Sequence, residues 1–178
     1  LSERPHGRNE SPIHAVAERK PFAHRPAVEP KSYGDAPLAT LLAADFVPGS
    51  LRAAYEAAAR HALERVRRRF AEAKGVKRLR LHADCHGGNI LWSDGPHFVD
   101  FDDCRSGPAI QDLWVLLSGG RAAMTRQLAA VLEGYRLFGD FDRTELLLIE
   151  PLRTLRLIHY AAWLAERWGD PAFPAAFP

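Results

Sequence analysis

The chain is poor in the features that mark secreted and membrane proteins. Its two cysteines, Cys85 and Cys104, are too few for a disulfide framework. A reducing cytoplasm is therefore the simplest expected location. No run of 18 apolar residues occurs, so no membrane span is expected, and the polar opening residues do not resemble a signal peptide. The formal net charge of +2 does not by itself require a nucleic-acid partner.

The apolar content is high enough for a folded domain. Hydrophobic residues make up 47% of the 178 residues, which predicts one domain with a real core. Residues 1–36 show no sustained periodicity and are interpreted as loop with one short helix around Ile13–Arg19. A short helix is expected over 37–46. A long helix capped by Ser50 should then run to Gly75, with one apolar stripe formed by Leu51, Tyr55, Ala58, Ala62, Val66 and Phe70.

The second half of the chain changes from strands to helices. Alternation predicts a strand over 78–82, and two more over 89–92 and 97–101 are separated by an Asp-Gly turn signal. Helical patterns follow over 109–119, 121–139 and 142–168, and Pro151 should kink or split the last of them. The tail from 169 to 178 should be irregular. The predicted fold class is α+β, mainly helical with a small β-hairpin.

Polar residues concentrate on this hairpin and on the loop before it. With a two-residue turn at Asp94-Gly95, Asn89 would lie opposite Asp100, so that both side chains share one face. An amide oxygen beside a carboxylate suits Mg²⁺. Asp84 stands five residues before Asn89, across a loop with two glycines that permit close approach to a ligand. A carboxylate beside a metal-held phosphate can orient an acceptor hydroxyl, as phosphoryl transfer requires.

Other interpretations of the cluster stay open. His82, Asp84 and His86 alternate along an extended segment and could form a zinc site. His82 alone is better explained as a buried residue that fixes a loop through hydrogen bonds. A purely structural role is a poor explanation for the carboxylates at 100, 102 and 103, because they repel one another unless a cation or basic group is near.

A basic stretch runs from Arg60 to Arg80, where nine Lys and Arg residues face only Glu64 and Glu72. The favoured interpretation is the solvated face of a helix, and the alternative is a strip that binds phosphate or RNA.

His82-x-Asp84 followed by Asn89 resembles the catalytic loop of protein kinases. The longer stretch "LHADCHGGNILW…FVDFDD…GPAIQDLWVLL" is closer to the aminoglycoside phosphotransferase/choline-kinase-like family. Within that family, "RKPFAHRP", "IEPLRTLRLIHYAAWLAERW" and "DPAFPAAFP" are similar to the bacterial stress response Ser/Thr protein kinases. The resemblance covers most of the chain from about Ile13.

The resemblance implies a protein-kinase-like C-lobe and roles for particular residues. Asp84 would be the catalytic base, and Asn89 and Asp100 would bind Mg²⁺ with ATP as phosphoryl donor. Asp100 stands in the place of the metal-binding aspartate of the kinase Asp-Phe-Gly motif. Asp112 would brace the catalytic loop, with His82 as structural support. Ala83 replaces a residue that is usually Gly in the subgroup, which matters only if position 83 needs a positive φ.

The implied activity is phosphoryl transfer to Ser/Thr hydroxyls of proteins by a cytoplasmic monomer, without nucleic-acid or membrane partners. The alternatives are transfer to an aminoglycoside or amino alcohol, and a non-catalytic binding module. No Gly-x-Gly-x-x-Gly loop or Val-Ala-x-Lys strand occurs, although kinases need such an N-terminal lobe. The chain also starts on Leu. We therefore expect residues 1–36 to be an inter-lobe segment, residues 37–178 to be a C-lobe truncated at both ends, and the isolated chain to be inactive.

Overall fold

The computed structural model describes His14, Ala17 and residues 22–171. The short helix expected around Ile13–Arg19 and the end of the expected irregular tail therefore lie largely outside the described residues. The chain forms two compact units. One combines residues up to Arg25 with Lys77–Arg143, and the other combines Pro26–Val76 with the chain from Thr144 onward. Each unit is described by itself.

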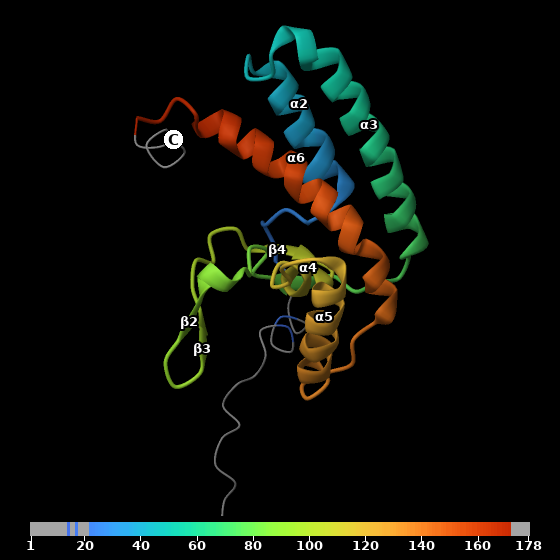
Figure 1. The fold of residues 1–178 in the computed structure, drawn as a ribbon, viewed down its shortest axis with the longest axis vertical. Helices are drawn as coiled ribbons and strands as arrows, with labels where there is room; N and C mark the ends of the chain where they lie inside the picture. Colours follow the sequence, from blue (N-terminus) through green and yellow to red (C-terminus); the bar gives the residue numbers. More distant parts are fainter. Residues whose placement is uncertain (1–13, 15–16, 18–21, 172–178) are drawn as a thin grey trace, which may run out of the picture. The chain divides into compact units, whose positions relative to one another are not determined.

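The second unit is helical (Figure 1). A π-helical turn, η1 (Lys31–Asp35), leads into α2 (Ala36–Ala43), and the long α3 (Gly49–Glu72) follows. The chain returns through the 3₁₀ helix η3 (Arg143–Leu148) into α6 (Ile149–Arg167). Helix α6 packs against η1, α2 and α3. The core between them is formed by Leu38, Leu41, Leu63, Val66, Leu152, Leu155 and Ile158, all of which are buried.

Helix α3 differs from the sequence prediction in two respects. The fully buried residues are Ala59, Leu63 and Val66. The predicted stripe is confirmed only in part: Val66 is buried and Tyr55, Ala62 and Phe70 are half-buried, whereas Leu51 and Ala58 are exposed. Packing against α6 buries a face that includes Ala59 and Leu63, which the predicted stripe left out. The Ser50 cap is also wrong, because the helix begins after Pro48 without a side-chain cap.

The ends of the helices follow the local sequence more closely. Gly75, just beyond α3, has a φ of +95°, which an L-residue adopts only at a cost. Pro151 lies in the first turn of α6, where its missing N–H costs no helical hydrogen bond. The predicted split near Pro151 is confirmed as the junction between η3 and α6.

The first unit carries two antiparallel two-stranded sheets within its described residues. One pairs β1 (Leu79–Leu81) with β4 (Arg105–Gly107), and the other pairs β2 (Ile90–Trp92) with β3 (Pro96–Phe98) as a hairpin. The 3₁₀ turn η2 (Gly87–Asn89) precedes β2. Helices α4 (Ile110–Trp114) and α5 (Arg121–Tyr135) follow β4.

The β4 strand was not predicted, because Arg-Ser-Gly has little strand propensity and its ladder with β1 is a non-local contact. The α+β class with a mainly helical chain and a small hairpin is confirmed. No helix in the described part of the chain has the length and hydropathy of a membrane span.

Candidate active site

The loop after β1 is held by the carboxylate of Asp112, which lies in α4. One oxygen, Oδ2, accepts a hydrogen bond of 2.9 Å from the backbone N–H of His82. The other, Oδ1, accepts one of 2.7 Å from the backbone N–H of Ala83. The amide of Gln111 donates to the carbonyl of Ala83 at 3.1 Å. Consecutive residues of α4 therefore fix the backbone of the loop just before Asp84.

Ala83 adopts a φ of +69°, in the left-handed region. This conformation costs an L-residue about 1–2 kcal/mol, and the hydrogen bonds from Asp112 and Gln111 hold it there. Position 83 therefore has the positive φ under which the replacement of Gly by Ala is expected to matter.

A second layer of polar contacts lies behind Asp112. The Nε2 atom of His14 is 3.0 Å from Asp112 Oδ2, and the Tyr135 hydroxyl is 3.3 Å from His14 Nδ1. A carboxylate only accepts hydrogen bonds, so His14 Nε2 carries a proton and donates to Asp112. His14 and Asp112 are both buried. The carboxylate that braces the loop is therefore itself fixed from the opposite side.

The peptide groups on both sides of Val99 are bound by the same loop. His82 Nε2 donates to the Val99 carbonyl at 2.7 Å, and the Val99 N–H donates to the Asn89 carbonyl at 3.0 Å. The ring of Phe101 packs on the His82 ring, with 4.7 Å between their centroids. We call these contacts the Val99 clasp. Asp100 stands between its two anchored neighbours, so the clasp ties its backbone to the loop of Asp84 and Asn89.

The predicted register of the hairpin was wrong by one residue. The ladder pairs Ile90 with Phe98 and Trp92 with Pro96, which places Val99, not Asp100, opposite Asn89. The turn is longer than the two residues assumed, with Ser93, Asp94 and Gly95 between the strands. Asp100 has a φ of +62°, so the strand's alternation of faces does not continue through it.

Asn89 presents its oxygen away from the loop. Its Nδ2 donates to the carbonyl of Asp84 at 3.0 Å. A carbonyl cannot donate, so the NH₂ group must face it and Oδ1 must point elsewhere. Asp100 is exposed, and its carboxylate makes no hydrogen bond or ion pair with described residues. An amide oxygen and a carboxylate left available on one hairpin fit a hard cation such as Mg²⁺.

The Asp84 carboxylate is partly exposed and lies 3.5 Å from His86 Nε2. His86 also accepts from the Gly88 N–H through Nδ1 at 3.0 Å. The zinc arrangement of His82, Asp84 and His86 is not formed: His82 Nε2 is bound to Val99, and within the described residues no three His, Cys, Asp or Glu side chains gather as a metal site.

The acidic residues after Asp100 lie near arginines. Arg25 donates to the carbonyl of Asp102, and Arg105 lies 4.0 Å from the Asp103 carboxylate. Of the three carboxylates at 100, 102 and 103, only that of Asp103 thus has a basic group beside it among the described residues.

The cysteine of this loop is chemically quiet. Burial, together with the negative charges of Asp112 and Asp84, raises the pKa of the Cys85 thiol to about 12. The thiolate is the reactive form of cysteine, so Cys85 is not a nucleophile at neutral pH. Burial also raises the pKa of Cys104. Both cysteines are free, as expected.

Sequence reasoning missed His14, Gln111 and Tyr135. His14 is 98 residues from Asp112 in the chain and lies in a segment with no periodicity. Gln111 directly precedes Asp112 in "QDLW". That adjacency was the one feature of the sequence that could have pointed to it.

Asp112 of α4 thus braces the loop that carries Asp84, and the Val99 clasp joins that loop to the segment of Asp100. Residues 11–147 match the phosphotransferase enzyme family, and the chain belongs to that family. Its architecture is that of a protein-kinase-like C-lobe.

Two curated relatives within this family are similar to most of the chain. The chain is 46% identical over 172 residues to "Stress response kinase A" of Escherichia coli K12. It is also 46% identical over 176 residues to "Serine/threonine protein kinase RdoA" of Salmonella typhimurium. Each match covers 97% of this chain and 52% of the relative, so the chain spans about half the length of these curated relatives.

Proposed function

We propose that the chain supplies the catalytic C-lobe for ATP- and Mg²⁺-dependent phosphoryl transfer to Ser/Thr hydroxyls of proteins. Residues 37–178 would form this lobe, and residues 1–36 would be the segment that leads into it. The observation that carries the proposal is the Val99 clasp, which joins the loop of Asp84 and Asn89 to the residue before Asp100 through hydrogen bonds of 2.7 Å from His82 Nε2 and 3.0 Å to the Asn89 carbonyl. Phosphoryl transfer depends mostly on such positioning of groups.

Each site residue has a role that its surroundings support. The partly exposed Asp84 carboxylate accepts the proton of the acceptor hydroxyl as general base. Asn89 Oδ1 and the Asp100 carboxylate hold Mg²⁺, which when bound neutralises the charge of the donor phosphates. His82 and Asp112 position these groups without touching substrate, since both are buried.

The acceptor is the least constrained part of the proposal. The relative from Salmonella typhimurium is named a serine/threonine protein kinase, which favours a protein hydroxyl. The family as a whole is defined by phosphotransfer, so a small-molecule hydroxyl is the alternative acceptor.

The test is transfer of radiolabelled phosphate from ATP to casein. The 178-residue chain alone should show no transfer, because neither a Gly-x-Gly-x-x-Gly loop nor a Val-Ala-x-Lys strand occurs in it to hold the nucleotide phosphates. A fusion to the N-terminal half of the Escherichia coli relative should be active. In that fusion, Asp84→Asn should lower turnover by about 10²-fold or more. Asp94→Asn, an exposed turn residue of the same hairpin, is the matched control and should leave turnover unchanged.

Several results would contradict the proposal. Full turnover by the Asp84→Asn fusion would contradict the assignment of Asp84 as the general base. Turnover by the 178-residue chain alone would contradict its predicted inactivity. An active fusion that phosphorylates kanamycin or choline but no protein would reassign the acceptor. An inactive fusion that still folds and binds proteins would favour a binding module.

Metal binding gives a second readout. Calorimetry should detect Mg²⁺ or Mn²⁺ in the fusion with a non-hydrolysable ATP analogue, and Asn89→Leu should abolish it. Stoichiometric zinc bound in preference to Mg²⁺ would contradict the oxygen ligand set.

A further inference from the structure

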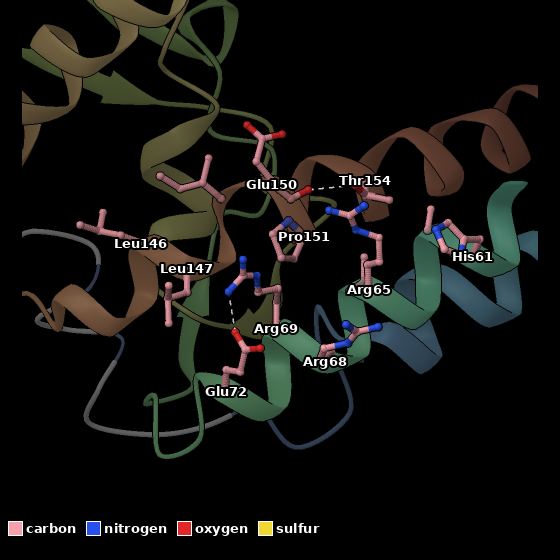
Figure 2. A pocket seen from close by; sticks show the side chains of 13 residues that line it. His61, Arg65, Arg68, Arg69, Glu72, Leu146, Leu147, Glu150, Pro151 and Thr154 are labelled. Atoms are coloured by element: carbon pink, nitrogen blue, oxygen red, sulfur yellow. Dashed lines mark hydrogen bonds and ion pairs between the residues drawn. The ribbon is translucent and has the colours of Figure 1, made fainter.

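Helices α3 and α6 enclose a groove that none of the roles above uses. It lies entirely within the second unit, between the last half of α3 and the junction of η3 with α6, and its volume is about 1070 Å³ (Figure 2). Pockets for small molecules typically measure about 300–1,000 Å³. The size therefore suits a segment of polypeptide as well as a small ligand.

One wall of the groove is cationic. Arg65, Arg68 and Arg69 stand at spacings of three and four residues, which places them on one face of α3. In Figure 2, Arg65 and Arg69 extend from α3 toward the start of α6. Arg69 is neutralised by Glu72, with 2.6 Å between Nη1 and Oε2. Arg65 and Arg68 have no ion pair or hydrogen bond with any residue that the structure describes.

The other wall is lined by apolar residues, and its polar side chains, Glu150 and Thr154, already make hydrogen bonds. Leu146, Leu147, Ile149 and Pro151 line it, and Leu147 is 43% exposed. Thr154 Oγ1 donates to the carbonyl of Glu150 at 2.9 Å. The Glu150 carboxylate accepts from Arg153, which does not line the groove, at 3.0 Å. Arg65 and Arg68, which have no ion pair with a described residue, thus share the groove with the exposed side chain of Leu147.

We propose that this groove docks an acidic segment of a partner protein, with carboxylates on Arg65 and Arg68 and an apolar side chain on Leu147. Guanidinium groups bind carboxylates through paired charge-assisted hydrogen bonds. An apolar residue between acidic ones would cover the leucine wall. This surface goes beyond the proposed function, because it involves no residue of the candidate active site.

RNA fits the groove less well, although the basic stretch alone had left it open. No Phe, Tyr or Trp is among the lining residues, so unpaired bases would find no stacking platform.

The test is an array of octapeptides whose positions carry Glu, Leu, Gln or Lys, probed with the 178-residue chain. Bound peptides should be enriched in Glu together with Leu. In solution, measured by fluorescence anisotropy, the best such peptide should bind the Arg65→Ala/Arg68→Ala variant about tenfold or more weakly. The double variant Arg121→Ala/Arg126→Ala removes the same charge from exposed positions of α5 and should change affinity less than twofold.

A third variant checks the apolar wall. Leu147→Ser, at an exposed position, should weaken binding of the Leu-containing peptide but not of its Gln counterpart. Circular dichroism should show that every variant is folded, as expected for exposed substitutions.

Four results would overturn the proposal. They are an array without enrichment in Glu, equal loss of affinity in the α5 control, tighter binding of single-stranded RNA than of any peptide, and self-association that the Arg65→Ala/Arg68→Ala change abolishes. The last would identify a second copy of the chain as the occupant.

Discussion

Replacing Asp112 by Asn isolates the contribution of one carboxylate to the geometry of the loop. The carboxylate accepts from the backbone N–H groups of His82 and Ala83, at 2.9 and 2.7 Å, and from His14 at 3.0 Å. Asn has the same shape but only one acceptor oxygen. If the amide oxygen faces the N–H of His82, the NH₂ group faces the N–H of Ala83, and two donors then oppose each other. In the reverse orientation the two donors oppose each other at His82. His14 can change its tautomer, but a backbone N–H cannot.

The expected loss of stability follows from this conflict. One buried hydrogen bond to a charged group is lost, at about 1.5–3 kcal/mol, and the bonds that stay now have a neutral acceptor. We expect Asp112→Asn to lower the free energy of unfolding by about 2–4 kcal/mol. For a chain of this size each kcal/mol corresponds to roughly 2–4 °C.

Two measurements check this expectation. Urea unfolding followed by circular dichroism gives the free energy, and amide hydrogen exchange reports on the His82 and Ala83 N–H groups individually. Both amides lose protection in the Asp112→Asn variant if the carboxylate fixes them. Asp94→Asn makes the same chemical change at an exposed turn residue and should cost less than about 0.5 kcal/mol. Unchanged exchange at both amides in a variant with wild-type stability would refute the reasoning.

Other substitutions test the packing and the thiols. Ala83→Gly relieves about 1–2 kcal/mol of left-handed strain but loses similar amounts of chain entropy and methyl burial. The free energy of unfolding in urea should therefore change by less than about 1 kcal/mol, and a larger loss would contradict the strain. Gly34→Ala places a Cβ 2.5 and 2.7 Å from two buried leucine methyl carbons and should lower the thermal midpoint through a cost of about 1–3 kcal/mol. Gly49→Ala, with nothing within 4 Å, is its control and should be neutral or stabilising. Because burial raises its pKa to about 12, Cys85 should stay protonated at pH 8 and react with Ellman's reagent only in urea, whereas the more accessible Cys104 reacts in the native protein. Rapid native labelling of a Cys104→Ser variant would contradict this.

Local sequence patterns predicted what depends on neighbours in the chain. Helices α2, α3, α5 and α6 and the β2–β3 hairpin follow from periodicity and turn residues. The buried face of α3 followed only in part, because the predicted stripe left out Ala59 and Leu63, which are buried where α3 packs against α6. The hairpin register failed for a similar reason: one additional turn residue moves every cross-strand pair.

In the candidate site, too, the features that depend on neighbouring residues were predicted and the long-range contacts were not. The polar cluster and Asp112 were recognisable from spacing and resemblance. The partners of Asp112 were not, since His14 comes from 98 residues away. The left-handed conformation of Asp100 was not predicted, and that of Ala83 was suggested only by the Gly that the resembling proteins usually have at this position.

The Val99 clasp also bears on how freely the gene can change at this position. Both of its hydrogen bonds use the peptide groups of residue 99, and none uses the valine side chain. Codons for many amino acids are therefore compatible with an intact clasp, with proline excluded because it lacks the N–H that reaches Asn89. Position 99 can drift over generations while the atoms that it holds stay where they are, so its variability would say nothing about its importance.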